Sequence, residues 1–235
     1  MASVREIQLA LKKNNCDPET TDGVMGRKTI AAIKKFQKEN GLIIDGIVGP
    51  KTLAVLIPNA RQGGVEIVPV EMPWLLEAYN LIGTQEEPGA GSNEAIVGWG
   101  RTVRINYSDD EIPWCGLFVA HCIGSQLLQE PLPINPLGAR NWHEFGQSCM
   151  LPQLGSIMVF WRGSPDGWKG HVGFYWAEDD TCYHILGGNQ SNCVSIVRLK
   201  KERLICARWP VNALLPNYGP RYTTKDGMLI SENEA

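Results

Sequence analysis

The residue best suited to chemistry is Cys115, in the stretch PWCGLFVAHCI at residues 113–123. Pro113 suits the first turn of a helix, where its missing N–H group costs nothing. Apolar residues then recur at helical spacing, at Phe118, Val119, Cys122, Ile123 and Leu127. A thiol at a helix N-terminus lies near unpaired N–H groups and the positive end of the dipole, which lower its pKa. Cys115 is therefore a candidate nucleophile, and the alternative is a small buried core residue.

A cysteine nucleophile needs a base that accepts its proton and a group that orients this base. The chain has four histidines. His121 lies six residues after Cys115 on the same helix, a rotation of roughly 240° that turns it away from the thiol. His143 lies in a loop that the sequence does not position. His171 opens a predicted strand after the turn-rich residues 164–170, at the mouth of a cleft, and is the best candidate base.

The orienting group is predicted from the hairpin that follows His171. Symmetric pairing about the turn at residues 178–181 places His171 opposite Gly188, beside Asn189. Strict pairing turns Asn189 to the other face of the sheet, so we expect a bulge or register shift at the adjacent glycines 187–188. Asn189 is the preferred third residue.

His184 is the alternative third residue. In the same register it faces Tyr175, four residues from His171 and therefore about 13 Å along the strand. This separation favours Asn189.

Acidic residues offer two other chemistries. Glu86 and Glu87 are candidate acids of a lysozyme-like glycosidase, although adjacent glutamates before Pro-Gly are also typical of a solvated loop. Asp109, Asp110 and Glu111 precede the helix of the candidate nucleophile, but three consecutive acids do not form an EF-hand loop. We expect a solvated turn there and no cofactor.

The elements that position these residues belong to a chain of 235 residues with an ordinary globular composition. Residues 1–15 contain no long apolar run, so we expect neither a secretion signal nor a membrane span, and synthesis in the cytoplasm. The seven cysteines are odd in number and include no CxxC pair, which argues against a disulfide framework or a thiolate zinc site. Apart from Cys115, they are read as structural thiols.

The net charge of −3 conceals an asymmetry. Residues 1–60 carry a net charge of +3 and the remainder carries −6. A small basic module joined to a larger acidic one is expected to dock on an anionic surface through the first part. The second part has no basic patch, so we expect no nucleic-acid partner.

The N-terminal part contains a repeat. DGVMGRKTIA at residues 22–31 and DGIVGPKTLA at residues 45–54 share D-G-x-x-G-x-K-T at a spacing of 23 residues. Each copy places glycines at a turn and then opens a helix, and an earlier helix is expected over residues 3–13. We interpret the repeated Asp and Gly as turn-forming residues, with Asp side chains accepting from backbone N–H groups.

This part, residues 1–58, resembles the three-helix peptidoglycan-binding domain found on many cell-wall hydrolases. The resemblance covers residues 3–57 and implies binding to bacterial cell wall, a polyanionic mesh that agrees with the positive charge. It does not assign a binding surface.

The rest of the chain predicts an α+β domain. Residues 59–72 have no helical period and contain Gly-Gly, so they form a predicted linker. Residues 73–210 form the second domain, with helices over residues 73–82, from Ser92 through Trp99, and from Cys115. Strands follow over residues 156–161, 171–177, 182–187, 194–199 and 204–209. Residues 211–235 are poor in apolar residues and predict a loosely held C-terminal tail.

Four motifs carry a second resemblance, over about residues 73–210. PWCGLFVAHC, GSIMVFW, GHVGF and ILGGNQ, in this order, resemble the CHAP and NlpC/P60 group of papain-like cysteine peptidases and amidases that cut peptidoglycan. The resemblance implies Cys115 as nucleophile, His171 as general base and acid, and Asn189 as the orienting residue.

The chain departs from these families in the third residue. CHAP members often pair a glutamate with the asparagine, but the corresponding position here lies near Gly187. In NlpC/P60 members the third polar residue is frequently a histidine, which keeps His184 as the alternative. Some CHAP domains bind calcium near the nucleophile, so this resemblance makes residues 109–111 a candidate calcium site.

Together the two resemblances imply a phage-type endolysin that hydrolyses peptidoglycan. The thiolate of Cys115 would attack an amide carbonyl, with the oxyanion held by backbone N–H groups at the helix start. His171 would protonate the leaving amine and then activate water. The amide is MurNAc–L-Ala, a stem bond or a cross-bridge bond. The alternatives are the glycosidase using Glu86 and Glu87, and a noncatalytic cell-wall-binding protein.

The expected partner is bacterial peptidoglycan, without nucleic acid and without stable membrane insertion. We expect a monomer that reaches the wall after release by a separate membrane-permeabilising protein. That route follows from family analogy alone.

Overall fold

The computed structural model describes residues 4–23, 26–42, 44, 46, 48, 50–57, 71–89, 91–216 and 220–221. The chain divides into two compact units, one of Met1–Val68 with Asn80–Gly83 and one of Pro69–Tyr79 with Thr84–Ala235. The predicted linker lies outside the described residues except for Glu71 and Met72, and Met72 is buried. Within the described residues, no helix is long and apolar enough to cross a membrane.

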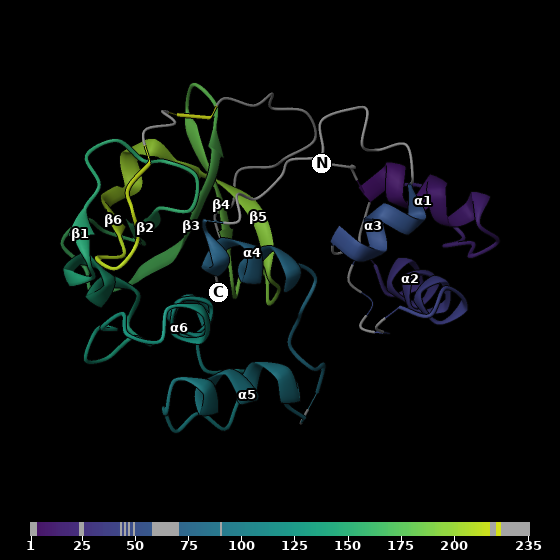
Figure 1. The fold of residues 1–235 in the computed structure, drawn as a ribbon, viewed down its shortest axis with the longest axis horizontal. Helices are drawn as coiled ribbons and strands as arrows, with labels where there is room; N and C mark the ends of the chain where they lie inside the picture. Colours follow the sequence, from purple (N-terminus) through teal and green to yellow (C-terminus); the bar gives the residue numbers. More distant parts are fainter. Residues whose placement is uncertain are drawn as a thin grey trace. The chain divides into compact units, whose positions relative to one another are not determined.

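The first unit is the predicted three-helix module (Figure 1). Its helices are α1 (Val4–Lys13), α2 (Arg27–Glu39) and α3 (Pro50–Leu56). Apolar residues from all three helices recur at helical spacing and meet in one core, which contains Ile7, Leu11, Cys16, Ala32, Ile33, Phe36 and Leu56.

Two buried glutamines, Gln8 of α1 and Gln37 of α2, hold the two copies of the repeat in the same way. Each side-chain oxygen accepts a hydrogen bond of 2.8 Å from the glycine N–H of the Asp-Gly turn. Each side-chain nitrogen donates to the threonine hydroxyl of the Lys-Thr pair, at 3.1 and 3.3 Å. The partners are Gly23 and Thr29 in the first copy, and Gly46 and Thr52 in the second. The repeat therefore builds the turns of the module.

The first aspartate of the repeat has side-chain partners. Asp22 accepts hydrogen bonds from Gln8 Nε2 at 3.0 Å and from the Thr20 hydroxyl at 3.2 Å. Asp45, the corresponding residue of the second copy, lies outside the described residues.

The second unit contains a six-stranded sheet in the order β1-β6-β2-β3-β4-β5, with every neighbouring pair antiparallel. Its strands are β1 (Gln147–Ser148), β2 (Ile157–Trp161), β3 (Gly170–Glu178), β4 (Cys182–Gly187), β5 (Ser195–Lys200) and β6 (Leu204–Trp209). The five predicted strands and the α+β class are confirmed. The short β1 was not predicted.

The helices of this unit are α4 (Pro73–Asn80), α5 (Glu94–Thr102) and α6 (Cys115–Gln126), with short 3₁₀ helices at Ala139–Glu144 (η2) and Lys201–Arg203 (η3). Helix α6 lies between the sheet and α5 (Figure 1). Phe118 of α6 contacts Phe174 of β3 and Trp99 of α5, with ring centroids 6.1 and 5.7 Å apart. Eight of its twelve residues are buried, which explains why the helix is apolar on several faces.

The register of the β3–β4 hairpin differs from the predicted one. Tyr175 faces Ile185, whereas His184 faces Ala177, and an irregularity separates Tyr175 from Ala177. The irregularity therefore lies within the ladder, between Tyr175 and Ala177, and not at the glycine pair where a bulge was expected. The pairing ends at Phe174, so the first residues of β3 extend beyond β4.

The described part of the C-terminal tail is held by specific contacts. Val211 and Asn212 donate backbone N–H groups to the carboxylate of Glu130, at 2.7 and 2.9 Å. Arg221 donates its N–H group to the Tyr175 hydroxyl at 3.0 Å. Its carbonyl accepts from the N–H group of Glu178 at 2.7 Å. The prediction of a loosely held tail is wrong for these residues.

Candidate active site

Cys115 is the first residue of α6 and is only 5% exposed. Its sulfur lies within hydrogen-bonding reach of the N–H groups of Val172, Gly116 and Cys115 itself. Burial nevertheless raises the pKa of the thiol, and this effect exceeds the lowering by the three N–H groups and by the charge of Arg162. The expectation of a lowered pKa is therefore wrong, because the helix start is buried. The raised pKa favours the neutral form of the Cys115 thiol.

The pairing of β2 with β3 explains why Val172 is available to the thiol. The N–H group of Arg162 donates to Lys169 O at 3.2 Å, which marks a hydrogen-bonded pair one residue beyond the end of β2. Hydrogen-bonded and non-hydrogen-bonded pairs alternate along an antiparallel ladder, and the pair of Val172 and Val159 is of the second kind. The N–H group of Val172 therefore points away from β2. On that side the ladder with β4 has already ended, and the N–H group reaches Cys115.

His171, the neighbour of Val172, is fully buried and has Gln190 as its side-chain partner. Nε2 of His171 lies 3.0 Å from Oε1 of Gln190. The structure thus places His171 and Gln190 at the edge where β3 extends beyond β4, and Val172, the next residue along β3, lies near the sulfur of Cys115. Nδ1 of His171 is buried and has no hydrogen-bond partner among the described residues.

The contacts of Gln190 fix the tautomer of His171. The side-chain nitrogen of Gln190 donates to Ser195 O at 2.6 Å and to Gly187 O at 3.1 Å, so its oxygen must face the imidazole. Nε2 of His171 therefore carries the hydrogen. In the neutral ring, Nδ1 is then the nitrogen that accepts a proton.

Asn189, the predicted orienting residue, is buried next to this site but faces other groups. With its amide oriented to match its neighbours, its oxygen accepts from the N–H group of Trp114 at 3.1 Å. Its nitrogen donates to Oε1 of Glu86 at 3.3 Å. The amide partner of His171 is thus Gln190, and Asn189 instead contacts the residue that precedes Cys115.

Backbone conformation explains why Gln190, and not Asn189, contacts His171. Asn189, Ser191 and Asn192 have φ values of 55°, 53° and 61°, the left-handed region that few non-glycine residues adopt. The segment 84–86 holds the loop in this shape, because Val194 N donates to Thr84 O at 2.7 Å and Glu86 N donates to Asn192 O at 3.0 Å. The left-handed turn at Asn189 carries the next side chain, Gln190, to His171.

Glu86 connects this loop to the start of α6. Its Oε1 accepts from the indole nitrogen of Trp114 at 2.8 Å and from Asn189. Burial raises the pKa of Glu86, the hydrogen bond from Trp114 lowers it, and the nearby charges of Asp110, Glu111 and Asp109 raise it further. Glu86 thus holds two elements together. Glu87 is exposed.

Two glycines allow the close approach of the elements that form the site. A Cβ atom on Gly188 would lie 2.6 Å from Trp114 and from Phe118, so a larger residue would push the loop away from α6. A Cβ atom on Gly116 would lie 2.2 Å from Pro136 O. Neither position has room for a side chain.

The acids before α6 do not form a metal site. Oδ2 of Asp110 accepts from the N–H groups of Asn93 and Glu87, at 2.7 and 3.1 Å. Its Oδ1 is buried and has no hydrogen-bond partner among the described residues. However, no group of three or more His, Cys, Asp or Glu side chains in this part of the chain is arranged to hold a metal ion. The geometry gives no support to a calcium site at residues 109–111.

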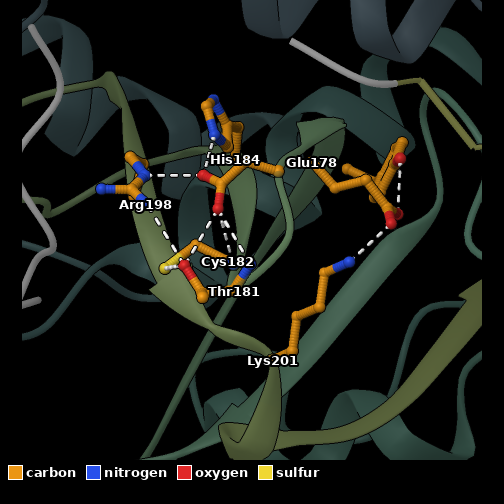
Figure 2. A network of polar contacts seen from close by, with 8 residues as sticks. Glu178, Thr181, Cys182, His184, Arg198 and Lys201 are labelled. Carbon is orange, nitrogen blue, oxygen red and sulfur yellow. Dashed lines mark hydrogen bonds and ion pairs between the residues drawn. The ribbon is translucent and has the colours of Figure 1, made fainter. Parts of the chain in front are cut away.

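His184, the alternative third residue, belongs to a separate buried network at the hairpin turn (Figure 2). Nε2 of His184 lies 2.8 Å from Oδ2 of Asp179, and Nε of Arg198 donates to the same oxygen at 2.7 Å. The hydrogen bond from Arg198 is the main cause of a strongly lowered pKa of Asp179, opposed by burial and aided by His184. This network joins β4 and β5 to the turn, and its contacts do not include His171.

The other two histidines lie in separate surroundings, as predicted for His121. Nε2 of His121 lies 3.3 Å from Glu77, and its ring stacks on Trp99 at 5.4 Å. His143 is exposed, with Nδ1 2.7 Å from Arg140 O. None of the seven cysteines, all of which are described, forms a disulfide.

Comparison with protein-family models identifies the first unit. Residues 1–56 match the family model described as "Putative peptidoglycan binding domain". This match supports a peptidoglycan-binding domain, with peptidoglycan as its ligand and cell-wall association as its role. Comparison with the curated proteins and with the solved structures gives no match.

Sequence reasoning missed three residues of the site, namely Gln190, Glu86 as a structural group, and Arg162. Gln190 directly follows Asn189, so the pair of adjacent amides after Gly-Gly was a usable signal for either residue. Glu86 lies 28 residues before Trp114 in the chain, and no local pattern links the two.

Proposed function

We propose that the protein is a peptidoglycan hydrolase that cleaves an amide bond through a covalent intermediate on Cys115. The observation that carries this proposal is the hydrogen bond between Gln190 and Nε2 of His171, whose neighbour Val172 lies near the buried thiol of Cys115 at the start of α6. This arrangement supplies a nucleophile, a base and an orienting group. The peptidoglycan-binding domain supplies the polymer on which the site would act.

In the first step, Nδ1 of His171 accepts the proton of the Cys115 thiol as the sulfur attacks the amide carbonyl. The N–H group at Nε2 stays on Gln190, which keeps the ring in place and stabilises the positive charge that forms. The raised pKa of Cys115 makes this proton transfer part of the reaction rather than a property of the resting enzyme.

The backbone N–H groups around the sulfur are suited to hold the oxyanion. In the resting state the N–H groups of Cys115, Gly116 and Val172 point to the thiol. When the sulfur bonds to the carbonyl carbon, the negative charge moves to the neighbouring oxygen, which can accept from the same groups. The C–N bond then breaks, and the imidazolium of His171 protonates the leaving amine.

In the second step, Nδ1 of His171 takes a proton from water, and the hydroxide attacks the thioester carbonyl. The acid product leaves and the proton returns to the thiol of Cys115. The biological setting that we infer from the resemblance to CHAP and NlpC/P60 hydrolases is that of an endolysin, which lyses a bacterial host from within.

The bond class can be tested by chemical analysis of digested wall. Purified peptidoglycan is incubated with the full-length chain, and new amino groups and new reducing sugars are both measured. We expect amines to appear without reducing sugars, and mass spectrometry of the soluble fragments then identifies the amide that is cut.

The two alternatives give different products in the same assay. A glycosidase using Glu86 and Glu87 would release reducing sugars, and we regard it as the weaker candidate because Glu86 is engaged by Trp114 and Asn189. A noncatalytic wall-binding protein would release neither product.

A further inference from the structure

Arg162 lies at the rim of the proposed active site. It follows Phe160 of β2 by two residues, and Phe160 is the cross-strand partner of His171. Because side chains alternate along a strand, Arg162 lies on the same face as His171, about 7 Å further along. The hydrogen bond from Arg162 N to Lys169 O extends the pairing to this position.

The charge of Arg162 reaches the nucleophile. Burial raises the pKa of Cys115, and the nearby charge of Arg162 opposes this effect. Arg162 is half-buried. The Arg162 side chain makes no hydrogen bond, ion pair or ring contact with another described side chain. By contrast, hydrogen bonds are donated by the side chains of Arg140, Arg198, Arg203 and Arg208.

The loop beside Arg162 is held firmly in place. Arg140 of η2 donates to three carbonyl oxygens of this loop, at Lys169, Pro165 and Ser164, over 2.8 to 2.9 Å. Gly170 lies so close to Arg140 that a Cβ atom there would be 2.8 Å from its Cγ. The rim that carries Arg162 is therefore preformed and does not depend on a ligand.

We propose that Arg162 binds a carboxylate of the substrate, next to the amide that Cys115 attacks. This inference rests on the proposed function and names the substrate class, a peptide-stem amide flanked by a free carboxylate. A guanidinium presents two parallel N–H donors that match the two oxygens of a carboxylate. Peptidoglycan stems carry free carboxylates beside amide bonds, so such a contact selects a stem bond over one flanked only by neutral groups.

The segment before α6 has the opposite charge. Burial raises the pKa of Glu86 most. The nearby negative charges of Asp110, Glu111 and Asp109 raise it further. An anionic group is repelled from that segment and attracted to Arg162, which gives the bound stem one direction.

The test measures binding and needs no hydrolysis. The full-length chain carrying Cys115→Ala is titrated by calorimetry with a synthetic stem peptide that has a γ-linked glutamate with a free α-carboxylate. The matched ligand is the same peptide with that carboxylate converted to a carboxamide. We expect the carboxylate form to bind at least about tenfold more tightly.

The variant Arg162→Gln, made in the same chain, should bind both ligands about equally, and Arg162→Lys should retain part of the preference because it keeps the charge. Lys200→Gln is the matched control, since it removes an exposed cation at the far end of β5. Equal binding of the two ligands by the parent chain, no binding of either, or a preference that survives Arg162→Gln would each overturn the proposal. Failure of the wild-type chain to hydrolyse wall, with the preference intact, would overturn the proposed hydrolase instead.

Discussion

Gln190 determines how His171 can act. Its nitrogen is committed to the carbonyls of Gly187 and Ser195, so its oxygen fixes the hydrogen on Nε2 and leaves Nδ1 as the proton acceptor. Asn189, one residue earlier, has the same functional group but a left-handed backbone that turns it to Trp114. At the residue scale, one backbone torsion therefore decides which amide serves the base.

We predict that Gln190→Leu lowers kcat by roughly tenfold to a hundredfold, because a displaced imidazole is a poor base. KM should change little, since Gln190 is buried behind His171. Gln190→Glu keeps an oxygen opposite Nε2 and should retain more activity than Gln190→Leu. Kinetics on a soluble stem peptide, with melting temperatures as control, measure this. Equal activity of the two variants would argue against an orienting role.

We expect the pKa of the Cys115 thiol to lie above its ordinary value, because burial raises it. Alkylation by iodoacetamide should therefore accelerate steadily between pH 6 and pH 9 rather than reach a plateau. The rate assigned to Cys115 is obtained by subtracting that of Cys115→Ala. A plateau already present at neutral pH would show a preformed thiolate and contradict this prediction.

At the scale of elements, the two ends of the β3–β4 hairpin differ. The turn carries the buried network of Asp179, and the other end lies at the proposed active site. The buried carboxylate of Asp179 binds both His184 and Arg198 at the turn, which ties β4 and β5 together. At the opposite end the pairing of β3 with β4 stops at Phe174, and the left-handed loop leaves the sheet after Gly187. The proposed site lies where the pairing of β3 with β4 ends, because backbone N–H groups there are not used by the ladder and can contact other groups.

We predict that Asp179→Asn lowers the free energy of unfolding by about 3–5 kcal/mol at pH 7, because the buried Arg198 loses its counter-charge. The native pKa of Asp179 is lowered chiefly by Arg198. Its stabilising effect is therefore complete above its unfolded value of about 3.9 and decreases as the pH falls below it. Urea unfolding at pH 7 and pH 3 should show the gap between wild type and variant narrowing in acid. A gap that widens at pH 3 would contradict this account.

The elements were predictable to different degrees for physical reasons. Short apolar runs bounded by Gly-, Pro- and Asp-rich turns predicted the five strands, and the helical spacing of apolar residues predicted the N-terminal module. The hairpin register was wrong because the irregularity lies near Trp176, where no glycine marks it. Cys115 and His171 were found from local context, whereas Gln190 depends on a left-handed turn held by residues 84–86.

At the scale of the whole molecule, the chain combines a wall-binding module with a unit that carries the proposed chemistry. The first unit has a net positive charge over residues 1–60 and the rest is negative. The module matches a peptidoglycan-binding family, and its repeat builds the turns that Gln8 and Gln37 hold. We therefore expect a substitution in one unit to impair wall binding or hydrolysis without impairing the other property.

We predict that Gln37→Leu weakens sedimentation of the full-length chain with purified wall, because the turn at Gly46 loses its side-chain acceptor. Hydrolysis of a soluble stem peptide should be unchanged. In the reciprocal variant, Cys115→Ala, sedimentation should persist while hydrolysis is lost. Parallel loss of both properties in either variant would show that the two units do not act separately.

The most direct test of the central claim is amine release from purified peptidoglycan by wild type, Cys115→Ala and Cys206→Ala. Cys206 is a partly exposed thiol on β6, which makes it a matched control. The account predicts that Cys115→Ala loses at least about a thousandfold in rate while Cys206→Ala keeps the wild-type rate. Amine release by Cys115→Ala at an undiminished rate would contradict it.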